Sequence, residues 1–448
     1  MSHSFSILAD PTALDLIRDI QTGALKRGTF WISLYQAGES IHADILVLLI
    51  DEKLTFQAEK QQIVVKLPEP VNGIVPNRLI LQTWKEAGID EPIDLIFPDN
   101  ELEAAVPPQE EEGDEQNNKF RRQPPSSDIT ALDISPQGGL YAIGTAKGEI
   151  LVGSTRTSKI LRKLTPNHLL DILQTRFFPA SSGEALISSS NDMHIRVWST
   201  ANGSNPRSFA ITGKPLSDPP SKLAFVGDTG RNFIANSGTD LYLWETGEEK
   251  LVHIFKGVDP IADFVVLMVD EYEIHDDAAE NPHEFGTNGA VVISLAAEAN
   301  KIAIWNVFTK KLIYATDLPG VDSDINVVSL LHFGHGVIIG ATSSGHLIVW
   351  SLKFSGGSTA DPEISVLVPL TQVSVFPIVG LTTLDSSLSV LVCTKSSPVL
   401  VELLEPQNQL KVKAVFLGFD AKAATAIASH GKRAYIAGKA GSLYEYNL

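Results

Sequence analysis

Cysteine and long apolar runs are what this chain lacks first. A single cysteine, Cys393, stands among 448 residues, so no disulfide framework can form and we expect a reducing compartment. The first ten residues show no basic stretch followed by an apolar core, and no apolar run approaches the ~18 residues that span a bilayer. We therefore expect a soluble intracellular protein of the cytoplasm or the nucleus.

Basic residues are also scarce. Lys and Arg number 35 against 53 Asp and Glu, which gives a formal net charge of −18. Nucleic acids and anionic membrane surfaces are bound through basic patches, so this balance argues against both as partners. A protein partner that offers Lys and Arg is favoured instead.

Motifs of catalysis and metal binding are missing as well. The sequence has no phosphate-binding loop ending in Gly-Lys-Ser/Thr, no G-x-G-x-x-G, no G-x-S-x-G and no H-E-x-x-H. His275 and His283 lie among acids in the segment 270–286 and could bind a metal, but a solvated flexible loop is the favoured interpretation. His332 and His335 lack a third ligand nearby. Cys393 ends an apolar run, which predicts a buried structural thiol. We expect no enzyme, no metal and no cofactor.

Repeats of a tryptophan-ended strand are what the sequence does contain. Four alternating runs end in Trp198, Trp244, Trp305 and Trp350, and three more fit the same register without Trp, at positions 153, 402 and 446. The spacings are 45, 46, 61, 45, 52 and 44. All but the 61 lie close to the WD-repeat period of roughly 40–45 residues, with four strands per blade. Residues 270–286, acidic and almost free of strand character, account for the longer interval as an insertion in blade 4.

The pattern predicts an all-β fold: a seven-bladed WD-repeat β-propeller preceded by a small α+β domain. The α+β domain takes residues 1–100, with a helix from about Asp10 to Leu25 followed by strands. Residues 101–118 carry seven acids and no Lys or Arg, which predicts a disordered linker. The propeller takes residues 119–448. Its last blade shows three strands, and we expect residues 119–124 to supply the fourth, since an open edge invites aggregation.

Several stretches resemble the proteasomal ATPase-associated factor family, whose members are WD-repeat chaperones of proteasome regulatory-particle assembly. They are ITALDISPQGGL (129–140), TRFFPASSG (175–183), GRNFIANSGTDLYLW (230–244), GHGVIIGATSSGHLIVW (334–350) and GSLYEYNL (441–448). The resemblance covers about 320 residues in order. It implies binding to the carboxy-terminal domain of one ATPase subunit of the proteasome base. We expect the protein to be a monomer on its own. The acidic linker, the insertion and the loss of Trp from three blades depart from the family.

A ring of carboxylates is the candidate binding site. In a propeller, the loops that enter the inner strands all emerge on one face, and loops on a rigid scaffold carry function. Six of the seven loops place Asp there, and only the sixth, Gln372 to Ile378, does not. The residues are Asp128, Asp171, Asp218, Asp259 with Asp263, Asp322 with Asp324, and Asp420. Asp is also a common turn residue for local reasons, so this acidic docking face is one of two interpretations.

Two further sets of residues carry a predicted role. Phe419, Asp420 and Lys422 combine an aromatic, an acid and a base in one loop, a composition typical of a binding hot spot. His168, Asp192 and Trp198 are interpreted as an internal hydrogen-bonded set that braces blade 2, and the other Trp residues as structural.

Two other classes of function remain open on the sequence. A WD-repeat substrate receptor or scaffold of a ubiquitin ligase also joins a small amino-terminal domain to a propeller, although no adaptor-binding helical motif is visible in residues 1–100. A propeller enzyme would need His and carboxylate groups converging in the central channel.

Overall fold

A computed structural model gives the fold of the chain. It describes residues 5–36, 39–50, 53–58, 63–70, 76–104, 127–209, 216–269, 283, 286–297, 299–354, 362–384, 388–404, 406–419 and 423–448. Most of the insertion 270–286, and residues 105–126 with most of the acidic linker and the segment 119–124, lie outside this description.

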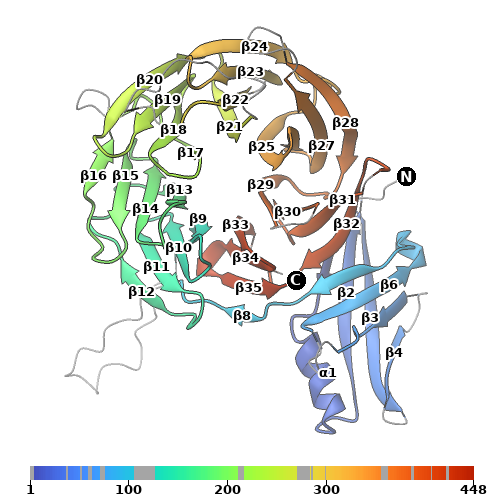
Figure 1. Cartoon of the computed structure of the whole chain (residues 1–448). Helices are drawn as coiled ribbons and strands as arrows, with labels where there is room; N and C mark the ends of the chain where they lie inside the picture. Colours follow the sequence, from blue (N-terminus) through green and yellow to red (C-terminus); the bar gives the residue numbers. More distant parts are fainter. Residues whose placement is uncertain are drawn as a thin grey trace, which may run out of the picture.

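Seven sheets follow one another around a ring in the described residues, and their first strands face the central channel (Figure 1). We number them as blades 1 to 7. Blade 1 holds β9 (Ile129–Ile134), β10 (Leu140–Thr145), β11 (Ile150–Ser154) and β12 (Ile160–Lys163). Blade 2 holds β13 (Ile172–Phe177), β14 (Ala185–Ser190), β15 (Ile195–Ser199) and β16 (Arg207–Phe209). Blade 3 holds β17 (Leu223–Val226), β18 (Asn232–Ser237), β19 (Asp240–Glu245) and β20 (Lys250–Lys256).

The remaining blades continue in chain order. Blade 4 holds β21 (Ile261–Met268), β22 (Ala290–Ala296), β23 (Lys301–Asn306) and β24 (Lys311–Asp317). Blade 5 holds β25 (Val327–Gly334), β26 (Val337–Thr342), β27 (His346–Lys353) and β28 (Glu363–Gln372). Blade 6 holds β29 (Ile378–Thr383), β30 (Ser389–Thr394), β31 (Val399–Leu404) and β32 (Gln409–Phe416). Blade 7 holds β33 (Ala424–His430), β34 (Arg433–Gly438), β35 (Leu443–Asn447) and, from far upstream, β8 (Asn100–Glu101); a short 3₁₀ turn, η3 (Lys439–Gly441), precedes β35.

The sequence repeat corresponds to the third strand of each blade. Each of the seven anchor positions, from Gly153 in β11 to Tyr446 in β35, falls on such a strand. These strands have neighbours on both sides, which explains why β19 is buried at every position whereas the outer strand β24 alternates between exposed and half-buried.

The hydrophobic core lies between consecutive blades rather than at one centre. Ile293 and Ile304 of blade 4 pack with Leu330 and Trp350 of blade 5, and similar clusters join the other neighbouring blades. Full burial of one such side chain contributes about 1.5–3 kcal/mol. The ring is therefore stabilised by the contacts of each blade with its neighbours.

The amino-terminal residues form a sheet and a helix. The sheet runs in the order β1 (Ser6–Ala9), β2 (Arg27–Gln36), β3 (Glu39–Ile50) and β4 (Lys53–Ala58), all antiparallel. Between β1 and β2 lies α1 (Ala13–Gln21), whose residues Ala13, Ile17 and Ile20 are buried at helical spacing. Asp10 precedes the helix and accepts hydrogen bonds from the Thr12 amide and hydroxyl at 2.9 and 2.7 Å.

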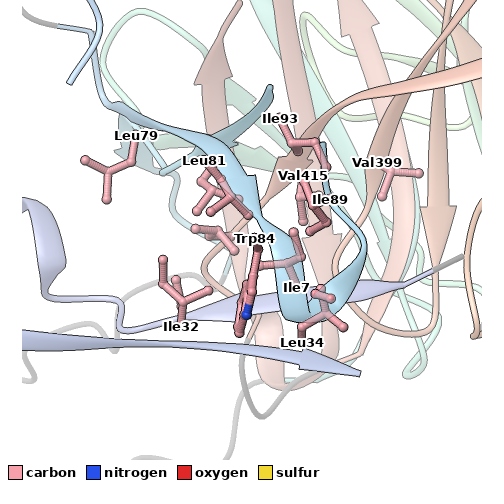
Figure 2. Packing of buried hydrophobic residues seen from close by; sticks show 14 of the residues in the cluster. Ile7, Ile32, Leu34, Leu79, Leu81, Trp84, Ile89, Ile93, Val399 and Val415 are labelled. Carbon is pink, nitrogen blue, oxygen red and sulfur yellow. The ribbon is translucent and has the colours of Figure 1, made fainter. Parts of the chain in front are cut away.

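Three further strands attach this region to the propeller. They are β5 (Ile63–Lys66), β6 (Arg78–Trp84) and β7 (Ile93–Ile96), with a short 3₁₀ turn, η1 (Lys85–Ala87), between the last two. β7 pairs in parallel with β32, so that blade 6 becomes a sheet of seven strands. Figure 2 shows Trp84 among apolar side chains of the amino-terminal strands, close to Val399 and Val415 of blade 6. The described residues between 5 and 97 therefore share one core with blades 5 and 6.

Ring closure uses a different segment from the one suggested by the sequence. β8 pairs with β35, with Tyr444 opposite Glu101 and Glu445 opposite Asn100, and the Leu102 amide donates to the Leu443 carbonyl at 2.8 Å. This is the edge at which residues 119–124 were expected. β8 also lies at the start of the segment interpreted as a linker, which explains why the acidic composition of residues 101–118 concealed it.

Candidate partner-binding face

One face of the ring collects the loops that lead into the inner strands. Each blade contributes four antiparallel strands, so every inner strand runs in the same direction and every entry loop emerges on the same side. The turns between the second and third strands lie on this side too. We call it the entry face; it comprises loops 127–128, 164–171, 216–222, 257–260, 318–326, 373–377 and 417–419, with turns 146–149, 191–194, 238–239, 343–345, 395–398 and 439–442.

Blade 2 contains the internal polar set expected of His168, Asp192 and Trp198, with Ser188 as its fourth member. His168 Nδ1 lies 2.9 Å from Asp192 Oδ2, and His168 Nε2 lies 2.9 Å from Ser188 Oγ. Trp198 Nε1 donates to the same Ser188 oxygen at 2.8 Å. The set ties the entry loop to the second and third strands of its blade.

Protonation in this set follows from burial and hydrogen bonding. Burial lowers the pKa of His168, although its bond to Asp192 opposes the shift. Burial also disfavours the Asp192 carboxylate, but bonds from His168 and from the Leu169 and His194 amides outweigh it and hold its pKa well below the ordinary value. A neutral His168 then donates from Nδ1 to Asp192 and accepts from the Ser188 hydroxyl at Nε2.

The other tryptophans are held differently. Trp350 Nε1 donates to the Pro319 carbonyl at 2.9 Å. The buried Trp244 Nε1 has no acceptor among the described residues. Trp305 is half-buried and lies 5.7 Å from the Phe255 ring, centroid to centroid. Part of the Trp305 side chain is therefore exposed, although the sequence predicted a structural residue like the other three tryptophans.

Three of the predicted face carboxylates have internal roles. Asp263 is buried; it forms an ion pair with Lys222 at 2.5 Å and accepts from the Leu330 amide at 2.8 Å. Its assignment to the partner surface is corrected, because a carboxylate so enclosed faces the neighbouring blades. Asp128 accepts from the Ala440 amide at 2.8 Å, and Asp171 accepts from the Asn191 amide group at 2.6 Å, so both are partly used within the fold.

The remaining predicted acids lie on one arc of the entry face. Asp218, Asp322 and Asp324 are exposed, and Asp259 is half-buried. Together with Asp171 they belong to blades 2 to 5. The turns of blades 6, 7 and 1 instead carry Lys395, Lys439 and Lys147. Among the described loops, the acidic surface is therefore an arc rather than a complete ring.

Exposed aliphatic side chains accompany this arc. The two most exposed large hydrophobic residues in the described chain are Val258, at 91 %, and Leu169, at 82 %. Both stand on entry loops, and Asp259 and Asp171 follow them within two residues. Leu170, also exposed, adjoins Leu169. Apolar groups set within a polar rim are typical of protein-binding surfaces.

The loop predicted as a hot spot differs from expectation. Phe419 is 4 % exposed and packs edge to face on Tyr444, with ring centroids 5.2 Å apart. Phe419 is therefore a core residue and not an exposed anchor. Asp420 and Lys422, the charged members of the proposal, lie outside the described residues.

Polar braces along the channel wall were not foreseen. Asp133 Oδ2 of blade 1 accepts from the Phe177 amide of blade 2 at 2.6 Å, and Gln174 Oε1 of blade 2 accepts from the Leu223 amide of blade 3 at 2.5 Å. Burial raises the pKa of Asp133 to about 6, although Arg176 and the backbone amides oppose the shift. The sequence signal for such a brace is a polar residue within an otherwise apolar inner strand, such as Asp133 in ITALDI (129–134).

Three further observations concern the cysteine, metal ligands and membrane spans. Cys393 is buried, and burial raises its thiol pKa. Among the described residues, no cluster of three or more His, Cys, Asp or Glu side chains could hold a metal ion. In the same part of the chain, no helix is long and apolar enough to cross a membrane.

Comparison with known proteins gives one relative by sequence. The chain is 36% identical over 194 residues to the 26S proteasome regulatory subunit RPN14 of Saccharomyces cerevisiae. The match covers 41% of this chain and 44% of the relative, so less than half of either protein is matched. No protein-family model matches the chain.

Solved structures share the fold. The RRP9 WD40 repeats match with a TM-score of 0.56 at 14% identity, covering 73% of this chain and 96% of theirs. The β-propeller domain of Cps50 (Swd1) from Myceliophteria thermophila matches with a TM-score of 0.57 at 12% identity, covering 73% of this chain and 99% of its own. At these identities the likeness establishes an all-β WD40 β-propeller fold and nothing about partners.

Proposed function

We propose that this protein is a non-catalytic chaperone of proteasome regulatory-particle assembly, which binds the carboxy-terminal domain of one base ATPase subunit through the entry face. The partial match to a 26S proteasome regulatory subunit supports a proteasome-related role. The observation that carries the binding mode is the pairing of Val258 and Leu169, the two most exposed large hydrophobics of the described residues, with adjacent aspartates on one face.

The apolar and the acidic residues of the entry face would contribute to binding in different ways. Exposed aliphatic groups supply binding energy when they are desolvated at the centre of an interface. The carboxylates of blades 2 to 5 attract a basic surface, raise the association rate and disfavour acidic competitors. A partner domain with Lys or Arg around an apolar patch fits both requirements. Binding would be weakened by salt, since exposed charges are screened.

The test is direct binding of the purified carboxy-terminal domain of each base ATPase subunit, measured by calorimetry at about 50 and 300 mM salt. We expect one domain to bind, more weakly at high salt. Val258→Asp with Leu169→Asp should weaken it at least tenfold. The matched control is Leu161→Asp, since Leu161 is 58 % exposed on β12 and away from the entry face. Absence of binding by every domain, or equal loss in the control, would refute the proposal.

The ubiquitin-ligase alternative has less support. An adaptor-binding role would require a helix with a free apolar face. In the described residues α1 buries its apolar face, Ala13, Ile17 and Ile20, against the amino-terminal sheets. That helix is a core element and is not available to an adaptor.

A further inference from the structure

A groove opens beside the entry face, between the outer parts of blades 3 and 4. Its cavity volume is about 340 Å³. Most of its wall is apolar, formed by Leu241 and Phe255 of blade 3 and by Ile261, Trp305 and Leu312 of blade 4. Loop 257–259, with the exposed Val258, forms its mouth. The volume lies in the range of small-ligand pockets.

Two small residues account for the space. Ala303 of β23 lies opposite Ala315 of β24, and Ala303 stands two residues before Trp305. The same positions of blade 3 hold Tyr242, two residues before Trp244, and its partner Ile254. Blade 4 therefore has two alanines where its neighbour has two large side chains, and the gap exposes one side of Trp305.

The groove is lined by the charged groups of Lys256, Lys301 and Asp259, and further carboxylates lie around it. Lys256 lies 2.6 Å from Asp240, and Lys301 is in register with Asp317 across β23 and β24. Asp259 also lines the groove, and within the described part of the chain no Lys or Arg forms an ion pair with it. Asp218 adds a fourth carboxylate. Its side chain lies against Gly238, in the turn beside the groove. The surroundings thus favour a cation next to an apolar group.

We propose that this groove receives an aliphatic or aromatic side chain of a protein partner, with an adjacent Lys or Arg of the partner beside Asp259. This rests on the proposed function in one respect, that the entry face binds a protein, and it names the chemistry of the segment bound. Trp305 and Phe255 supply the apolar contact. Anchor side chains that fill such pockets carry a large share of binding energy.

The experiment refills the groove with the residues of blade 3. Ala303→Tyr with Ala315→Ile should leave the fold intact, because the neighbouring blade already holds that pair. Thermal unfolding checks this, and Ala315→Ile alone, at an exposed position, is the second variant if the double variant unfolds. The probe is a random twelve-residue peptide library displayed on phage, selected on the wild-type protein. We expect selected peptides to carry an apolar residue next to Lys or Arg and to bind the refilled variant at least tenfold more weakly.

The outcomes separate this proposal from the proposed function. Selected peptides that lack the motif, or that bind the refilled variant equally well, overturn the groove assignment. If an ATPase domain binds, is lost with Val258→Asp and Leu169→Asp, and is retained by the refilled variant, the groove assignment fails while the proposed function stands. If no ATPase domain binds but the peptides behave as expected, the groove assignment stands and the proposed function fails.

Discussion

Blades 2 and 4 follow the same strand pattern, yet their tryptophans lie in different surroundings. In blade 2, Trp198 is buried and donates to Ser188, which His168 also contacts. In blade 4, Trp305 is half-buried and faces a groove left by Ala303 and Ala315. The repeat therefore maintains the fold in both blades, whereas a departure from it leaves a half-buried tryptophan beside a groove.

The largest expected effect compares the two tryptophans. Trp198→Ala should lower the free energy of unfolding by about 4 kcal/mol, since it opens a cavity and removes a hydrogen bond. Trp305→Ala should cost about 2 kcal/mol, because part of that side chain is already in contact with water. Urea unfolding of both variants measures the difference. Equal losses would show that Trp305 is as much a core residue as Trp198.

The inner strands of the same blades offer a second comparison. Blade 2 is braced at the channel by Asp133 of blade 1, which accepts from the Phe177 amide, whereas Asp263 of blade 4 is ion-paired with Lys222. Removing one member of an enclosed ion pair leaves the other charge without compensation.

Asp263→Asn should therefore lower the free energy of unfolding by about 3 kcal/mol. Asn retains an acceptor for the Leu330 amide, so the loss reports mainly the charge of Lys222. The measurement is urea unfolding at neutral pH, and Lys222→Met combined with Asp263→Asn is the control that removes both charges. If the double variant is no more stable than Asp263→Asn, the ion pair is not the cause.

Sequence patterns predicted the repeated strands better than the long-range pairings. The Trp strands and the set of His168 and Asp192 have local or repeated signals. The closing strand does not, because β8 spans two residues and pairs with β35 some 345 positions away, as in the bond from Asn100 to Glu445. No composition signal distinguishes so short a strand from the acidic segment that follows it.

The position of the entry face was predictable, but the surroundings of its individual residues were not. Propeller topology alone places the entry loops on one side. Whether a given Asp side chain is available at the surface depends on partners from other strands, such as Lys222 for Asp263. In the same way, Phe419 is buried because it packs on Tyr444. The groove depends on the register that brings Ala303 opposite Ala315. These contacts follow from the folded arrangement and not from any one segment.

The smallest expected effect concerns the pH dependence of Asp133. Its pKa is raised to about 6 in the fold, against an ordinary value of 3.8, so the folded state binds a proton that the unfolded state releases between these values. Stability from this group must therefore increase as pH falls from above 6 towards 4, by about 1 kcal/mol after allowance for solvent screening. Asp133→Asn keeps an acceptor for the Phe177 amide and cannot titrate. Thermal unfolding of both proteins at pH 7.5 and 5 should show that the wild type gains stability relative to the variant at the lower pH. A constant difference in stability between the two proteins would mean that Asp133 titrates in the fold as it does in the unfolded chain.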